Sequence, residues 1–104
     1  MLRKNYYKSG KKCRVWFYLP ADVDADTATL VGDFNDWDET SHPMKKKADG
    51  TFYIALTLDT GCDYQYRYHL DGERWENDWH ADYYAPNDMG TENSVVSLKV
   101  DLKN

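Results

Sequence analysis

The chain has 104 residues, enough for one domain with a modest core and too few for a second. Its formal net charge is −5. Residues 1–14 contain basic side chains but no acid, so the other residues carry 7 of the 13 basic side chains and all 18 acidic ones. This balance repels phosphate backbones and excludes nucleic acid as the main partner, and the 15% of aromatic residues excludes a disordered chain.

From the first residues of the sequence we expect no signal peptide. Residues 1–4 are followed by polar and aromatic residues, without the apolar stretch that a signal peptide requires. The longest apolar run, VWFYL at residues 15–19, is too short to cross a bilayer. We therefore expect a cytoplasmic protein with no membrane partner. Cys13 and Cys62 could form one bridge, but in a reducing compartment we expect two buried thiols.

Apolar residues that alternate with polar ones predict the strands in chain order. Residues 1–12 are basic and are expected to form an edge strand protected by lysines, although they could also contact an acid. The alternation is clear over residues 13–19, 52–58 and 64–70, and Val96, Leu98 and Val100 suggest a last strand. No window repeats at the helical period of 3.6.

Turn signals separate these strands. Asp49 with Gly50, Thr60 with Gly61, and Asp71 with Gly72 are all typical of hairpins or tight turns. Strands at such spacing, with no helix between them, predict an all-β antiparallel sandwich. We expect seven or eight strands in a single domain over residues 1–104.

The sequence offers little support for a metal site or for catalysis. Asp22, Asp24 and Asp26 have the spacing that opens a calcium loop, but Thr27 stands where that loop needs Gly. The three histidines lack zinc-ligand spacing, and no glycine loop could hold phosphates. A glycosidase needs a carboxylate pair across a cleft, for which this chain has little material. We expect no metal, no cofactor and no enzymatic activity.

Several tryptophans stand among polar residues. Trp37 lies in VGDFNDWD at residues 31–38, and Trp75 and Trp79 lie four apart in ERWENDW. Such neighbours could not be buried beside an indole without hydrogen-bond partners. Arg67 and His69 alternate with tyrosines and therefore share the opposite face of their strand. A flat aromatic ring surrounded by polar side chains can bind a sugar, which has an apolar face and hydroxyl groups along its edges.

Four motifs occur in the order ATLVGDFNDWD, PMKKKADGTFYIALTL, YQYRYHLDGERW and GTENSVV. In this the chain resembles family 48 carbohydrate-binding modules, such as the glycogen-binding domain of the AMP-activated protein kinase β subunit and the N-terminal domain of isoamylases and glycogen branching enzymes. The similarity runs from about residue 13 to residue 100. It implies an immunoglobulin-like β-sandwich that binds α-1,4-glucans such as glycogen, starch or maltooligosaccharides, with glycogen-metabolising enzymes as candidate partners.

The resemblance also implies roles for individual residues. Trp37 and Trp75 would be the two stacking platforms, and Arg67 takes the place of a Lys directed at sugar hydroxyls. In MGTEN, Met89 takes the place of a Leu that contacts the sugar chain in the family. Thr91 and Asn93 match polar residues of the family that bind the sugar.

Three features depart from the family pattern. One additional residue separates Gly72 from Trp75, Glu92 adds a charge near the site, and Trp79 replaces a Pro. Each could weaken or reshape binding. They leave open an alternative, a protein-interaction or regulatory domain of the same fold that has lost sugar binding.

The motif around Trp37 has a structural alternative. We expect Phe34 to plug the core, Asn35 to form a turn and Trp37 to face outward, whereas an indole folded back over the core would act only as a lid. The same alternative applies to Trp75.

Other candidate residues also have simple packing explanations. Packing is the expected role of Trp16 and Trp79. Arg67 could be part of a cross-strand ion pair, and Thr91 and Asn93 could be turn residues that begin the last strand.

Overall fold

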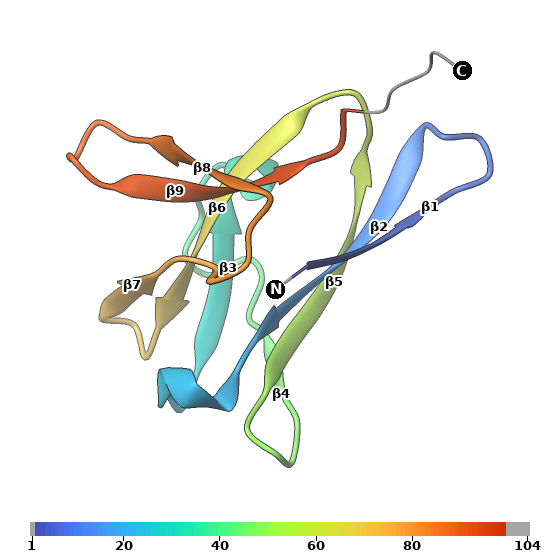
Figure 1. The fold of residues 1–104 in the computed structure, drawn as a ribbon. Helices are drawn as coiled ribbons and strands as arrows, with labels where there is room; N and C mark the ends of the chain where they lie inside the picture. Colours follow the sequence, from blue (N-terminus) through green and yellow to red (C-terminus); the bar gives the residue numbers. More distant parts are fainter. Residues whose placement is uncertain (1, 100–104) are drawn as a thin grey trace.

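The computed structural model describes residues 2–99, which form an all-β sandwich of two antiparallel sheets (Figure 1). Sheet A has the order β1-β2-β5-β4, and its strands are Leu2–Tyr6, Lys12–Leu19, Phe52–Asp59 and Lys45–Lys46. Sheet B has the order β3-β6-β9-β8, with strands Ala28–Gly32, Asp63–Leu70, Glu92–Ser97 and Tyr83–Pro86; β7, Arg74–Glu76, also pairs with β6. Two single-turn 3-10 helices, η1 at Ala21–Val23 and η2 at Asp33–Asn35, flank β3.

This architecture confirms the predicted immunoglobulin-like antiparallel sandwich. The described residues contain nine strands rather than seven or eight, because β4 has two residues and β7 three. Strands of two or three residues are too short for an alternation of apolar and polar residues to be recognised in the sequence. All three predicted turns contain a glycine with positive φ, between 69° and 94°.

The two ends of the chain agree in part with expectation. β1 pairs only with β2 and forms the edge of sheet A, as the basic residues 1–12 predicted. The last strand begins and ends earlier than the apolar pattern suggested, at Glu92 and Ser97, while Leu98 is still buried. Val100, which we also placed in that strand, lies outside the described residues.

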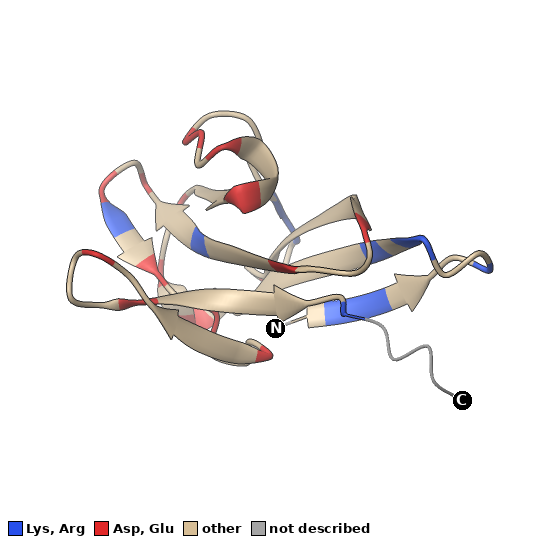
Figure 2. Ribbon diagram, turned by 90° about the horizontal axis from the view of Figure 1, so that it is seen from above, with Lys and Arg blue, Asp and Glu red and all other residues tan. Residues whose placement is uncertain are grey.

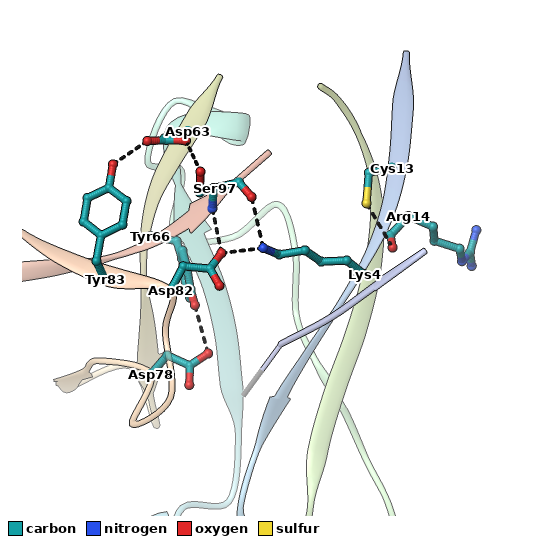
Figure 3. Close-up of polar contacts among 9 residues, drawn as sticks. All are labelled: Lys4, Cys13, Arg14, Asp63, Tyr66, Asp78, Asp82, Tyr83 and Ser97. Carbon is teal, nitrogen blue, oxygen red and sulfur yellow. Dashed lines mark hydrogen bonds and ion pairs between the residues drawn. The ribbon is translucent and has the colours of Figure 1, made fainter. Parts of the chain in front are cut away.

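The core lies between the sheets and is rich in rings. Phe17 meets Tyr66 edge to face, with ring centroids 5.1 Å apart, and Phe34 packs against both. The expectation that Phe34 plugs the core is therefore confirmed. Both buried tyrosines on β6, Tyr66 and Tyr68, donate their hydroxyls to Asp78 Oδ2, at 2.9 and 3.1 Å (the Tyr66 contact is drawn in Figure 3). Burial raises the pKa of both phenols well above the usual value, so they remain protonated donors.

A polar contact ties the two sheets together at one open edge. Lys4 on β1 reaches across to sheet B, where its Nζ donates to Asp82 Oδ2 at 2.7 Å and to the Ser97 carbonyl at 3.0 Å (Figure 3). The backbone N–H of Ser97 donates to the same Asp82 oxygen. The lysine thus joins the edge strand to the opposite sheet as well as protecting it.

The cysteines are both free thiols, but they differ in burial. Cys13 points into the core, and burial raises the pKa of its thiol. Cys62 is exposed, so the expectation of two buried thiols is wrong for this residue, which lies in the β5–β6 turn rather than on a strand face. Within residues 2–99, no helix has the length and apolar character needed to span a membrane.

Candidate functional site

The candidate site lies on the outer face of sheet B, the face turned away from the core. Tyr66, Tyr68 and Leu70 of β6 are buried, so the alternate residues Gln65, Arg67 and His69 point outward. Strand pairing adds neighbours to this row: Trp75 of β7 lies opposite His69, and Val95 of β9 lies opposite Gln65. Asn93, two residues before Val95, shares the same face.

Trp75 lies flat against its neighbours on this face. Its ring stacks on that of His69, with centroids 4.2 Å apart and planes 24° apart. The guanidinium of Arg67 lies 5.8 Å from the Trp75 ring centroid, in cation–π range. The side chain is still 38% exposed, so Trp75 is not a lid over the core. Across the β6–β7 turn, Trp75 lies in register with His69.

Arg67 has an unused hydrogen-bond donor. Its Nε is buried and has no hydrogen-bond partner. Among the described residues, no carboxylate forms an ion pair with Arg67, so the cross-strand ion pair is wrong. The carboxylate oxygen Oε1 of Glu39 lies 3.6 Å from Nδ1 of His69, the next outward-facing residue on β6. A buried donor without an acceptor is costly, so Arg67 is held on this face at some expense in stability.

The loop that carries Trp37 is joined to β6 by a single carboxylate. Trp37 Nε1 donates to Asp33 Oδ1 at 2.9 Å, and Asp33 Oδ2 accepts the backbone N–H of Gln65 at 2.8 Å. The indole is half-buried. Its position beside Gln65 places it near the outer face, and its use as a stacking platform stays a prediction.

The same loop has an unusual backbone. Asp36 and Trp37 both have left-handed φ values, 56° and 58°, which a bulky residue such as Trp rarely adopts. The Asn35 side chain holds this turn, because it accepts the Gly32 N–H and donates to the Leu30 carbonyl, each at 3.1 Å. The prediction that Asn35 forms the turn is confirmed. Strain of this kind often occurs at functional positions.

The β8–β9 hairpin is organised by one side chain, Asn87. Its Oδ1 accepts the backbone N–H groups of Met89 and Thr91, at 2.9 and 3.2 Å, and its Nδ2 donates to Asn93 Oδ1 at 3.0 Å. Asn93 in turn donates to Gln65 Oε1 at 3.0 Å, which links the hairpin to β6. Met89 is 84% exposed at the tip. Thr91 is thus a turn residue, whereas Asn93 belongs to β9 itself.

These contacts connect the predicted site residues in two groups. A chain of hydrogen bonds through Asp33, Gln65 and Asn87 links Trp37 to the hairpin with Met89, Thr91 and Asn93, whereas Arg67 contacts Trp75 directly. The roles of Asp33, Gln65 and Asn87 were missed from the sequence. Alternation places Gln65 beside Arg67, but nothing in the spacing indicates the other two.

Two further tryptophans can now be placed. Trp16 is half-buried on the outer face of sheet A and stacks on Tyr18, with ring centroids 6.5 Å apart. Trp79 is 48% exposed in the β7–β8 loop, so the expectation that it packs is wrong. Residues 2–99 bring together no group of three or more His, Cys, Asp or Glu side chains that could hold a metal ion.

Comparison with known proteins identifies relatives of this chain. Residues 5–85 match the family described as Carbohydrate-binding module 48 (Isoamylase N-terminal domain). The 1,4-alpha-glucan branching enzyme GlgB of Butyrivibrio fibrisolvens is 31% identical over 75% of this chain and 11% of its own length. GlgB of Aquifex aeolicus is 44% identical over 51% of the chain and 9% of the enzyme, and the 1,4-alpha-glucan-branching enzyme of Saccharomyces cerevisiae is 56% identical over 32% and 5%. The chain thus spans about a tenth or less of the length of these relatives.

Proposed function

The chain belongs to the carbohydrate-binding module 48 family, and from this premise we propose that it binds α-1,4-glucans, without catalysis, on the outer face of sheet B. The proposed ligands are glycogen, starch and maltooligosaccharides. The proposed contact residues are Trp37, Arg67, Trp75, Met89, Thr91 and Asn93.

The observation that carries this proposal is the pairing of Trp75 with Arg67. A partly exposed indole offers an apolar surface to the CH face of a glucosyl unit, and the guanidinium of the adjacent Arg67 forms no ion pair among residues 2–99. A sugar ring satisfies both at once, because its hydroxyl edge accepts hydrogen bonds while its face stacks. His69, on the neighbouring strand β6, stacks against one side of the indole and supports it.

The contacts of the hairpin divide the remaining roles. Met89 is free to lie against the sugar chain, because its side chain is almost fully exposed. Asn93 is largely buried and uses one amide N–H on Gln65 and one oxygen lone pair on Asn87, so we assign it mainly to holding the hairpin against β6, with one donor and one acceptor position remaining for a hydroxyl at its exposed edge. Thr91 is bound to Asn87 through both its N–H and its hydroxyl, so we assign it mainly to shaping the tip.

The magnitudes favour weak binding of short glucans. A ring that covers one glucose face buries about 60 to 80 Å² of apolar surface, or about 1.5 to 2 kcal/mol. Two such platforms and a few hydrogen bonds, offset by the cost of association, give a Kd between about 10 μM and 1 mM. A polymer would be held more firmly, since it offers many such sites. We therefore propose a targeting role, in which the module holds glucan for glycogen-metabolising enzymes.

Glycogen co-sedimentation tests this function. Trp37→Ala and Trp75→Ala should each weaken binding by about tenfold or more, because each removes one platform. Trp16→Ala is the matched control, since it makes the same change on the outer face of sheet A and should leave binding intact. Circular dichroism would verify that each variant is folded.

Failure of the unsubstituted chain to pellet with glycogen would contradict the proposal. The chain would then be better described as a protein-interaction domain of the same fold. Equal loss of binding in the Trp16→Ala variant would show that the assay reports stability rather than the site.

A further inference from the structure

We propose that the groove between the end of β2 and the β7–β8 loop is a second glucan-binding subsite, separate from the outer face of sheet B. This inference rests on the proposed function, because it assigns the groove a ligand of the same class. It gives a role to Trp79, which the outer-face site does not use.

The groove has the size and lining of a ligand site. Its volume is about 470 Å³, within the range of small-molecule sites. Its apolar walls come from Tyr18, Pro20 and Trp79, and its polar groups include those of Thr51 and His80. Flat rings with hydroxyl and imidazole groups beside them repeat the chemistry of the outer face.

Trp79 presents its ring ready for stacking. Trp79 is 48% exposed, although the large apolar surface of an indole favours burial. Its Nε1 already donates to Glu76 Oε2 at 2.8 Å, so a ligand can cover the ring without burying an unpaired N–H. A glucosyl unit stacked on Trp79 would remove apolar surface from water at little polar cost.

The loop that carries Trp79 is held firmly by Asp78. The buried Asp78 receives the hydroxyls of Tyr66 and Tyr68 and, on its other oxygen, the His80 N–H at 2.9 Å. Its own N–H donates to Ser94 Oγ at 2.8 Å. Trp79 and His80 therefore project from a fixed backbone, and binding would cost little ordering of the loop.

The charge of the groove favours a neutral ligand. Among the described lining residues Lys47 is the one lysine or arginine, and its Nζ lies 5.6 Å from the ring centroids of both Tyr18 and Tyr53. The one carboxylate that the described residues contribute to the lining, that of Asp78, is buried and accepts hydrogen bonds from internal donors. With one ammonium held against two rings, the groove offers hydroxyl-binding donors rather than an anion-binding cluster.

The groove and the outer face of sheet B are lined by different elements, because Tyr18 belongs to β2 of sheet A and Lys47 and Thr51 lie between β4 and β5. Trp75 is on the outer face, whereas the segment that follows it turns inward, where Asp78 meets the core hydroxyls of Tyr66 and Tyr68. Two runs of glucosyl units would therefore bind separately. On a branched polymer, the two sites would act together and raise the apparent affinity about 10²-fold or more above that of either site.

Titration of the isotope-labelled chain with maltoheptaose, followed by ¹H–¹⁵N NMR, tests this inference. Each indole N–H gives its own signal, so Trp75 reports the outer face and Trp79 the groove. We expect the Trp79 indole and the Thr51 and His80 amides to shift along one binding curve, with a second curve for Trp75. Trp79→Ala should abolish the groove shifts at Thr51 and His80 and leave the Trp75 curve unchanged.

The outcomes separate the two proposals. Shifts at Trp75 with none at Trp79 would overturn the second subsite and leave the proposed function intact. Shifts at Trp79 alone would support the subsite and overturn the outer-face site. If neither Trp75 nor Trp79 shifts, both proposed sites are overturned. Tyr6→Ala removes an exposed ring at the far end of sheet A and should change neither curve. Should Trp79→Ala unfold the chain, Trp79→Leu keeps apolar bulk without a flat ring and should likewise lose the groove shifts.

Discussion

At the scale of the residue, Gly32 shows how close packing positions a site. A Cβ added at Gly32 would lie 2.5 Å from the Gln65 carbonyl oxygen and 2.8 Å from the Tyr66 Cβ. The backbone there is extended, so the constraint is steric and not conformational. Gly32 also binds the loop of Trp37, because its carbonyl accepts the Trp37 N–H at 2.9 Å. A side chain at this position would push the loop away from β6.

We predict that Gly32→Ala lowers the free energy of unfolding by about 1 to 3 kcal/mol, the usual cost of overpacking. It should also weaken glycogen binding, because Trp37 would be displaced. Urea unfolding and co-sedimentation measure the two effects. Gly61→Ala is the control: Gly61 has φ +94° and open space around it, so the variant should lose about 1 to 2 kcal/mol of stability through backbone strain without losing binding. Full glycogen binding by Gly32→Ala would show that the loop does not depend on this contact.

At the scale of the element, the long strands could be predicted from the sequence and the short ones could not. β2, β5 and β6 each have eight residues, and alternation in the sequence locates all three. Burial follows a period of two in β2 and over most of β6, whereas residues 53–56 of β5 are all half-buried. β8, Tyr83–Pro86, was not predicted, because its exposed residues carry no alternation. An edge strand is defined by its backbone pairing, here with β9, which side-chain patterns do not record.

In the candidate site, too, the residues on long strands could be predicted from the sequence, and the contacts between elements could not. Alternation placed Arg67 and His69 on one face, since both lie on a long strand. The stack of His69 on Trp75 depends on the register between β6 and β7, which the length of the intervening loop alone does not determine. The hydrogen bond between Asp33 and Gln65 joins segments distant in sequence, for which no local pattern exists. The hydrogen bonds of Asn87 lie within one hairpin, but residue spacing alone did not indicate them.

The β6–β7 turn is an element with its own acid dependence. Asp71 adopts a left-handed φ of 53°, and its Oδ1 accepts the N–H groups of Thr27 and Asp26 at 2.9 and 2.8 Å. These hydrogen bonds, that of Thr27 first, lower the pKa of Asp71. A carboxyl whose folded pKa lies below its unfolded value of about 3.9 stabilises the fold above that pH, and the contribution is lost as the pH falls through the folded pKa.

We therefore predict that Asp71→Asn destabilises the chain at pH 7 and that the difference shrinks at about pH 3 and below. Asn tolerates the left-handed backbone and keeps an oxygen acceptor, so the substitution removes chiefly the charge. Urea unfolding of both proteins at the two pH values measures this difference. An equal difference in the free energy of unfolding at the two pH values would mean that the turn, and not the ionised carboxylate, supplies the stability.

At the scale of the whole molecule, charge is distributed unevenly. Strands β1, β2 and β4 of sheet A contain Arg and Lys but no acid, whereas acidic positions predominate in the loops that surround sheet B (Figure 2). The proposed glucan face lies on the opposite sheet from these basic strands. Its one full cation, Arg67, has no carboxylate partner among residues 2–99 and lies against Trp75.

This distribution predicts that glucan binding is insensitive to salt. A neutral glucan releases no counterions when it binds, and stacking and hydrogen bonds are little affected by ionic screening. Raising NaCl from about 50 to about 500 mM should therefore change the apparent Kd for glycogen by less than about twofold, although the Debye length falls severalfold. The measurement is co-sedimentation at a series of salt concentrations, with Trp75→Ala as the weakened reference. A fall in affinity of tenfold or more would instead place the interaction on the basic strands of sheet A, because binding through their ammonium and guanidinium groups depends on long-range attraction that salt removes.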